Sequence, residues 1–216
     1  MKSHLEILND LLAEKAIAIV RLDSGEQLVR VAEALKTGGV SVIEFTLSTP
    51  GALDMLKKAS ARFGEEVLLG AGTVLDSETA RTAILAGAEF IVTPTVNLET
   101  IAMCKRYGKP IVAGAMTPTE MLTVWEGGAD LVKVFPAREL GGPDYIKTVL
   151  APLPQLRLVP TGGVSAENAA QYLKAGAAGV AVGGNLVNKQ AVASGDWETV
   201  TAEAQRLISV VKSAAG

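Results

Sequence analysis

Two charged residues lie inside apolar stretches of the sequence, where an unpaired charge is costly. Glu44 is in the run VSVIEF (40–45), and Lys133 is in the run ADLVKVFP (129–136). Side chains alternate along a strand, so each of these residues shares a strand face with its second neighbours on either side. If both faces point into one interior, a carboxylate and an amine approach each other in a site of low dielectric constant.

Such a pair predicts chemistry on carbonyl compounds. Burial lowers the pKa of a lysine, and a carboxylate neighbour raises it again. An amine that stays partly neutral attacks a ketone and forms an imine, whose protonated form is an electron sink for breaking or making the adjacent carbon–carbon bond. Glu44 would then move protons at the carbinolamine and at the α-carbon. A structural ion pair that fills the top of the fold is the alternative.

Short apolar runs divide the chain at regular intervals. Each run is continuous rather than alternating, which is typical of parallel strands covered on both faces. Segments with helical periodicity, such as SETARTAILAGA (77–88), lie between them. The runs are residues 17–20, 40–45, 67–72, 88–94, 110–115, 129–136, 156–163 and 177–184.

This alternation of eight strands with helices favours a (β/α)8 TIM barrel. A weak internal repeat supports the barrel, because a glycine ends a helical segment just before a strand at four places. These are Gly39, Gly87, Gly128 and Gly176. An open doubly wound sheet is the alternative, but GAGT (70–73) lacks the third glycine of a dinucleotide-binding loop. We predict a single barrel domain over residues 1–216, with an N-terminal helix in MKSHLEILNDLLAEK.

The reactive groups of such a barrel lie at the carboxyl ends of its strands. In a ring of eight, the second and sixth strands are opposite, so Glu44 and Lys133 should approach each other across the barrel. Further candidate substrate contacts at strand ends are Arg21, Thr73, Pro94 and Phe135. Each also has a structural interpretation: Arg21 as a surface charge, Thr73 as a helix cap and Pro94 as a strand terminator. The phenylalanine ring could simply pack.

The last two apolar runs end in doubled glycines, TGGV (161–164) and VGGN (182–185). The loops after the last two strands of such barrels commonly bind phosphate, because glycines let backbone N–H groups approach an anion and a helix N-terminus adds a favourable dipole. Ser165 would cap that helix. Tight turns between short elements are the alternative. The candidates are Thr161 for the substrate and Gly162, Gly163, Gly184 and Asn185 for phosphate.

The overall composition favours a small-molecule partner. Lys and Arg number 20 and Asp and Glu 23, a net charge of −3, and no run of like charges marks a nucleic-acid or membrane surface. The lone Cys104 excludes an intrachain disulfide, and the N-terminal sequence has no secretion signal, so we expect a cytoplasmic location. With 49% hydrophobic residues and few aromatics, apolar helix surface should be covered by further copies of the chain.

The motifs, in their order, resemble those of the 2-keto-3-deoxy-6-phosphogluconate (KDPG) aldolases. The likeness runs from about residue 15 to 190 and rests on GGVSVIEFTL, LLGAGTV, FIVTP, GAMTPTE, LVKVFPA, VPTGGV and the late VGG run. The resemblance implies a homotrimeric (β/α)8 barrel without metal or other cofactor. It also implies reversible class I aldol cleavage to pyruvate and glyceraldehyde 3-phosphate, in the Entner–Doudoroff route, with Lys133 as the Schiff-base lysine and Glu44 as the general acid and base.

The same resemblance implies roles for the other candidates. Thr73 and Pro94 would lie at the pyruvate end of the substrate, and Phe135 would pack beside the lysine. The phosphate end would be formed by Gly162, Gly163, Gly184 and Asn185.

Two positions depart from the family pattern, and both concern the substrate. Many members have an arginine four residues after the catalytic glutamate, where this chain has Ser48, and a small residue such as serine often stands at the position of Asn185. The STP sequence and Arg21 are closer to relatives that act on the galactonate epimer. The 6-phosphogalactonate analogue and 4-hydroxy-2-oxoglutarate are therefore alternative substrates. A non-catalytic barrel for phosphate-sugar binding or assembly is the alternative of another class.

Overall fold

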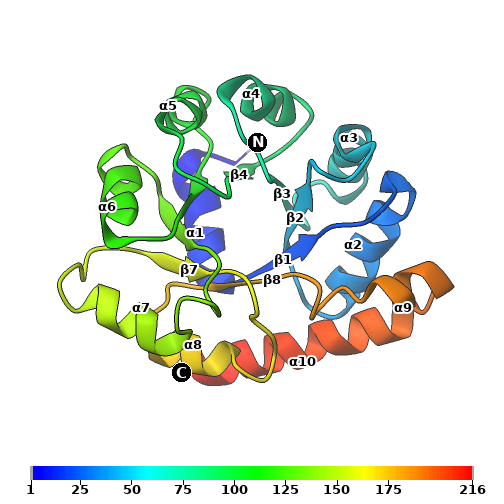
Figure 1. Ribbon diagram of the computed structural model, residues 1–216. Coiled ribbons are helices and arrows are strands. Elements are labelled where there is room, and N and C mark those ends of the chain that lie inside the picture. Colours follow the sequence, from blue (N-terminus) through cyan, green and yellow to red (C-terminus); the bar gives the residue numbers. More distant parts are fainter. Residues whose placement is uncertain (1, 216) are drawn as a thin grey trace.

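The computed structural model describes residues 2–215 and arranges eight parallel strands in one sheet. The strands follow the order β7-β6-β5-β4-β3-β2-β1-β8, and a parallel bridge between Thr161 and Ala181 joins β7 to β8. The ring is therefore closed, as Figure 1 shows, and the predicted TIM barrel is confirmed. The strands are β1 (Ala16–Val20), β2 (Val42–Thr46), β3 (Leu68–Gly72), β4 (Phe90–Val92), β5 (Ile111–Ala115), β6 (Leu131–Val134), β7 (Leu158–Pro160) and β8 (Val180–Val182).

Helices connect the strands and cover the outside of the ring (Figure 1). Several begin where the sequence supplies a capping side chain: Asp76, Asn97 and Thr117 each accept a hydrogen bond from the backbone N–H three residues later. The helices are α1 (His4–Glu14), the 3-10 helix η1 (Gly25–Gln27), α2 (Leu28–Thr37), α3 (Ala52–Phe63), α4 (Ser77–Leu85), α5 (Leu98–Arg106), α6 (Pro118–Glu126), α7 (Pro143–Leu150), α8 (Ala169–Lys174), α9 (Lys189–Ser194) and α10 (Trp197–Ala215).

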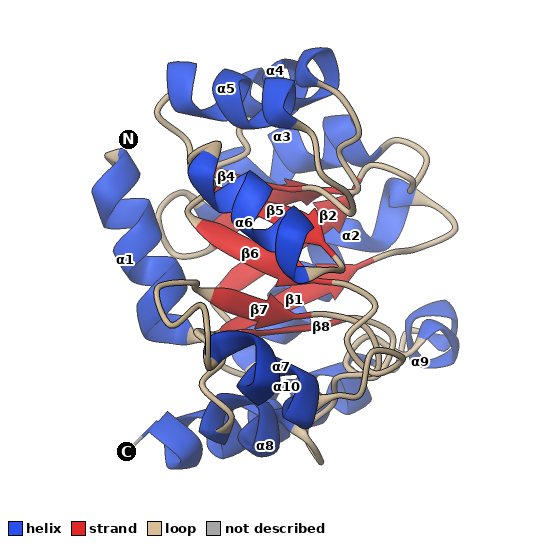
Figure 2. Ribbon diagram, turned by 60° about the vertical axis from the view of Figure 1, so that its left-hand side comes forward, coloured by secondary structure: helices blue, strands red, loops and turns tan. Residues whose placement is uncertain are grey.

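The predicted N-terminal helix closes one end of the barrel. It starts with a capping box, in which Ser3 and Glu6 each bond the backbone N–H of the other. Its apolar residues Ile7, Leu8 and Leu11 pack against the side chains of the barrel interior. Figure 2 shows α1 at one end of the strands and α9 at the other. The interior is therefore open to a substrate at the carboxyl ends of the strands.

Alternation along the strands separates an inner from an outer set of side chains. The inner apolar set is Ile17, Val42, Leu68, Phe90, Val92, Val112, Leu131, Val159 and Ala181. The outer set, which includes Ile43 and Phe45, packs under the helices. Because Val42 and Leu131 point inward, Glu44 and Lys133, two residues further along the same strands, also point inward. The interior thus changes from apolar next to α1 to charged near the carboxyl ends.

The weak repeat seen in the sequence corresponds to a repeated turn. Gly39, Gly87, Gly128 and Gly176 each lie between a helix and the next strand, with φ values from 91° to 107°. This left-handed backbone is the usual glycine C-terminus of a helix. The repeated turn explains why each strand begins almost directly after a helix.

Candidate active site

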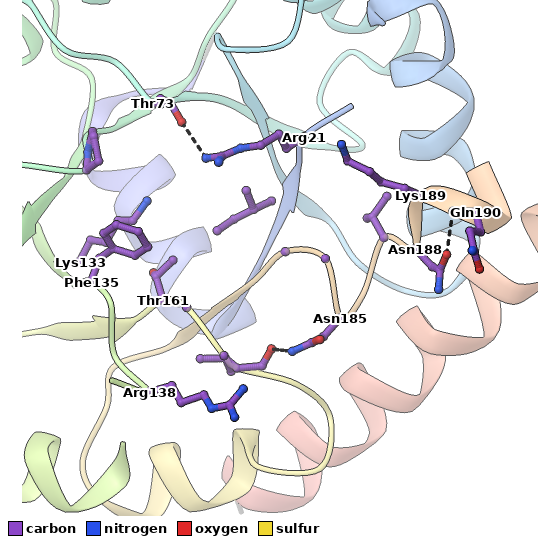
Figure 3. A pocket seen from close by; sticks show the side chains of 18 residues that line it. Arg21, Thr73, Lys133, Phe135, Arg138, Thr161, Asn185, Asn188, Lys189 and Gln190 are labelled. Atoms are coloured by element: carbon purple, nitrogen blue, oxygen red, sulfur yellow. Dashed lines mark hydrogen bonds between the residues drawn. The ribbon is translucent and has the colours of Figure 1, made fainter. Parts of the chain in front are cut away.

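A pocket of about 800 Å³ opens at the carboxyl ends of the strands, where TIM barrels carry their active sites. All of the predicted site residues except Glu44 line it, and Figure 3 shows the labelled side chains among them around one space. These lining residues are Arg21, Thr73, Pro94, Lys133, Phe135, Thr161, Gly162, Gly163, Gly184 and Asn185. Spacing along the sequence thus predicted most of the pocket wall.

Lys133 is a buried amine within this pocket. Its position on β6 leaves it 6% exposed. Burial lowers the pKa of Lys133 below the ordinary lysine value, the Glu44 carboxylate opposes this shift, and the positive charge of Arg21 adds to it. The ring of Phe135 lies 5.4 Å from Nζ, measured to its centroid, and borders the same pocket. The environment therefore favours a neutral, nucleophilic amine.

Glu44 lies deeper than the pocket wall and is 1% exposed. Neither of its carboxylate oxygens has a hydrogen-bond partner in the part of the chain that the structure describes. Burial raises the pKa of Glu44, although the positive charges of Lys133 and Arg21 act in the opposite direction. A Cβ at Gly72 would lie only 1.5 Å from Oε1 of Glu44. The glycine on β3 therefore makes room for this carboxyl group.

The geometry does not support a structural ion pair between these two residues. Both face the same interior, but the oxygens of Glu44 bond neither to Lys133 nor to any other described group. A buried carboxyl group that bonds to no other protein group calls for an explanation, and a role in catalysis is one. Both pKa shifts favour the neutral forms. A neutral amine beside a protonated acid is the combination that forms and dehydrates a carbinolamine.

Arg21 and Thr73 meet at the edge of the pocket. Arg21 follows β1, and its Nη2 donates a hydrogen bond of 3.3 Å to Oγ1 of Thr73 (Figure 3). Thr73 has φ of 58°, a left-handed conformation that is rare for a β-branched residue and that in proteins clusters at active sites and ligand-binding sites. Asp76 caps α4 by accepting a hydrogen bond from the N–H of Thr79, so the capping interpretation of Thr73 is wrong.

The loop after β7 turns through two glycines with left-handed backbone. Gly162 and Gly163 have φ of 96° and 71°, values that L-residues rarely adopt. The loop after β6 is bonded to it: the N–H of Ala137 donates to the carbonyl of Thr161 at 2.8 Å, and the N–H of Arg138 donates to that of Gly162 at 3.2 Å. These two hydrogen bonds fix the loops after β6 and β7 to each other at the pocket.

The loop after β8 has accessible backbone at the pocket and is hydrogen-bonded to the loop after β7. Nothing lies within 4 Å of a Cβ built on Gly184, which leaves its backbone accessible. Nδ2 of Asn185 donates to the carbonyl of Val164 at 3.0 Å, so this side chain ties the two glycine loops together. Ser165 does not cap α8 as predicted, because a turn separates it from the helix, which starts after Asn168 without a side-chain cap.

Two cationic residues of the pocket were not predicted from the sequence. Arg138 packs its aliphatic part on Gly163, and its guanidinium has no hydrogen bond or ion pair within residues 2–215. Lys189 lines another side of the pocket (Figure 3), and its Nζ is 2.6 Å from Oδ1 of Asp23. Their charge and their position just after apolar runs were the available signals. Only the folded loops show that both side chains reach the pocket.

Other groups with reactive chemistry lie elsewhere. Burial raises the pKa of the Cys104 thiol to about 12, which makes it a poor nucleophile. His4 Nε2 is 2.7 Å from Oδ1 of Asp130, at the end of the barrel closed by α1. Within residues 2–215, no group of three or more His, Cys, Asp or Glu side chains is arranged to hold a metal ion.

None of the helices in residues 2–215 combines the length and the apolar character needed to cross a bilayer.

Curated proteins similar to this chain cover most of it. The 2-dehydro-3-deoxy-phosphogluconate aldolase of Treponema pallidum is 39% identical over 198 residues, which cover 91% of this chain and 93% of that protein. The 2-dehydro-3-deoxy-6-phosphogalactonate aldolase of Escherichia coli is 34% identical over 171 residues, or 79% of this chain and 83% of that protein.

Solved structures lead to the same group. A KDPG aldolase from Legionella pneumophila, with pyruvate captured as a covalent carbinolamine intermediate, has a TM-score of 0.85 at 28% identity and covers 95% of this chain and 98% of its own. A native KDPGal structure has a TM-score of 0.85 at 32% identity, covering 93% and 95%. The family model for KDPG and KHG aldolase matches residues 7–203. The chain therefore belongs to the KDPG and KHG aldolase family, and it is a lyase.

Proposed function

We propose that this aldolase cleaves KDPG reversibly to pyruvate and glyceraldehyde 3-phosphate through a Schiff base on Lys133. The observation that carries the proposal is the buried pair of Lys133 and Glu44, which face one interior without bonding to each other. Its pKa shifts favour a neutral amine and a protonated acid. Cleavage of KDPG would give the protein a role in the Entner–Doudoroff route of carbohydrate metabolism.

The chemistry follows from these two groups. The neutral amine of Lys133 attacks the C2 carbonyl, and the carbinolamine loses water after Glu44 donates a proton to its hydroxyl. Glu44, now a carboxylate, takes the proton of the C4 hydroxyl while the C3–C4 electron pair moves into the iminium, which releases the aldehyde and leaves an enamine. Glu44 then returns the proton to C3. Water adds to the resulting imine, and its hydrolysis releases pyruvate and restores the free amine.

The pyruvate half of the substrate would occupy the side of the pocket next to the lysine. The guanidinium of Arg21 and the hydroxyl of Thr73, already in contact with each other, would bind the carboxylate through a charge-assisted hydrogen bond. Pro94 and the 41% exposed ring of Phe135 would shield the imine from water. Thr161, bordering the same space, would contact the sugar-acid chain.

The phosphate would bind at the opposite end of the pocket. The backbone N–H groups of Gly162, Gly163 and Gly184 are the proposed donors, because their loops border open space. Arg138 supplies a positive charge beside them. We propose that Asn185 contributes through its backbone, since its side-chain amide bonds to the neighbouring loop.

Pyruvate release from KDPG tests the proposal. Wild-type protein should release pyruvate at full rate in the presence of a chelator, because the imine supplies the electrophile that a metal ion would otherwise provide. Lys133→Met should release none. A wild-type protein that binds KDPG without releasing pyruvate would instead be the non-catalytic barrel.

The galactonate epimer is the second candidate substrate. Ser48 stands where many members have arginine, so one charge-assisted contact worth roughly 1.5–3 kcal/mol is missing. Discrimination between the epimers should therefore be loose, with Ser48→Arg improving one at the expense of the other. Turnover of both phosphorylated epimers, and of 4-hydroxy-2-oxoglutarate, measures this. A strict preference for one epimer that Ser48→Arg leaves unchanged would contradict it.

We also propose a cytoplasmic homo-oligomer, with three copies as the expected number. Exposed apolar side chains occur on neighbouring units at the carboxyl side of the barrel: Leu75 after β3, Leu98 at the start of α5 and Met116 after β5, at 57%, 48% and 47% exposure. A second copy would cover them. Sedimentation should show a trimer that Leu75→Glu weakens. A wild-type monomer at micromolar concentration would contradict this assembly.

A further inference from the structure

The backbone on both sides of Arg21 is held by side chains of the next loop. Thr46 ends β2 and Thr49 lies just before α3, and they are 0% and 2% exposed. The N–H of Leu22 donates to Oγ1 of Thr49 at 3.1 Å. Oγ1 of Thr46 donates to the carbonyl oxygen of Val20 at 3.3 Å. The peptide groups before and after Arg21 are thus each bonded to a buried hydroxyl.

The two hydroxyls also complete a chain of hydrogen bonds. Their oxygens are 3.3 Å apart. Oγ1 of Thr49 accepts a hydrogen bond from the N–H of Leu22, so the Thr49 hydroxyl can donate to Oγ1 of Thr46. The Thr46 hydroxyl in turn donates to the carbonyl oxygen of Val20. The chain therefore starts at one peptide group and ends at another, with the α-carbon of Arg21 between them. Because both hydroxyls are buried, water does not compete for these bonds.

We propose that Thr46 and Thr49 are positioning residues that hold Arg21 at the pyruvate end of the pocket. The inference rests on the function proposed above, in which the guanidinium of Arg21 binds the substrate carboxylate. The Arg21 side chain is exposed, and its bond to Thr73 is a long one of 3.3 Å. A long, exposed side chain loses much conformational freedom when it is fixed. Fixing its backbone in advance limits the positions that the guanidinium can reach and reduces that loss when substrate binds.

The test replaces Thr49 and measures recognition of pyruvate. Thr49→Val removes the hydroxyl at nearly constant volume. In an assay of exchange of the pyruvate methyl protons with solvent, it should raise the KM for pyruvate about tenfold and leave the maximal rate within about twofold of the wild-type value. Tenfold corresponds to 1.4 kcal/mol, a reasonable value for one buried hydrogen bond. Thr49→Ser keeps the hydroxyl and should restore the KM. The matched control is Thr100→Val in α5, where a buried hydroxyl without a partner is removed far from the pocket.

A second background shows whether Thr49 acts through Arg21. In an Arg21→Met protein, whose KM for pyruvate should already be high, Thr49→Val should add no more than about a twofold further change. An equal increase in both backgrounds, or an unchanged KM in Thr49→Val protein that folds normally by thermal scan, would overturn the inference. Failure of the proposed function is distinguishable, because the wild-type protein would then catalyse no exchange at all.

Discussion

Replacing Gly72 by alanine should disable proton transfer while Lys133 stays reactive. The new Cβ would lie 1.5 Å from Oε1, 2.1 Å from Cδ and 2.5 Å from Cγ of Glu44. Ordinary contacts between such atoms need about 3.5 Å, so the carboxyl group must retreat by about 2 Å. Proton transfer requires heavy atoms within about 2.6–3.2 Å of each other. We therefore expect a loss of about 10²–10⁴-fold, the usual contribution of one general acid and base.

The assay is loss of pyruvate methyl protons to deuterated solvent, followed by NMR. The final yield of pyruvate trapped on the amine with borohydride after long incubation should fall much less, because displacing Glu44 slows dehydration of the carbinolamine but leaves the lysine in place. In a Glu44→Gln background, Gly72→Ala should add less than about a threefold further loss of exchange, because the side chain at position 44 no longer transfers protons. Exchange that stays within about threefold of wild type would show that Gly72 does not hold the Glu44 carboxyl group in place. So would a full additional loss in the Glu44→Gln background.

Two further predictions follow from the charges of the pocket. Glu44→Gln should abolish exchange of the pyruvate methyl protons, yet it should raise the thermal midpoint at pH 8. Burial raises the pKa of the Glu44 carboxyl in the folded protein above its unfolded value of 4.5, so the carboxyl contributes stability that is fully present below pH 4.5 and is lost as pH rises through the folded-state pKa. Glutamine does not ionise and therefore avoids this loss. Thermal scans at pH 4 and pH 8 measure it, and an equal effect at both would contradict it. Arg138→Ala should raise the KM for phosphorylated substrate about tenfold at low salt and less at high salt, because the proposed contact with phosphate is exposed and charge-assisted. Steady-state kinetics at two salt concentrations check this, and an unchanged KM at low salt would exclude the contact.

The barrel and its charged pair were predictable because they depend on local pattern. A run such as VSVIEF has a side-chain period of two, so the inward position of Val42 determines the inward position of Glu44. The glycine turns were predictable for the same reason, since a helix C-terminus recruits glycine locally. The order of runs along the chain then placed β2 and β6 on opposite sides of the ring.

The loops could be predicted less well, because their conformations depend on contacts between distant segments. Ser165, which follows TGGV, was predicted to cap a helix, but a turn follows Ser165 instead. The sequence of the β8 loop does not show that Asn185 bonds to the β7 loop. Similarly, the packing of Arg138 on Gly163 depends on two loops that meet only in the folded barrel. The space that Gly72 leaves for Glu44 is a relation between two strands.

Mass spectrometry of the protein after treatment with pyruvate and borohydride shows whether Lys133 is the lysine that forms the Schiff base. We expect one reduced pyruvyl adduct per chain, on the peptide that contains Lys133, formed at undiminished yield in the presence of a chelator and absent from Lys133→Met protein. The absence of any adduct under conditions where wild-type protein releases pyruvate from its substrate, or an adduct on another lysine, would contradict it.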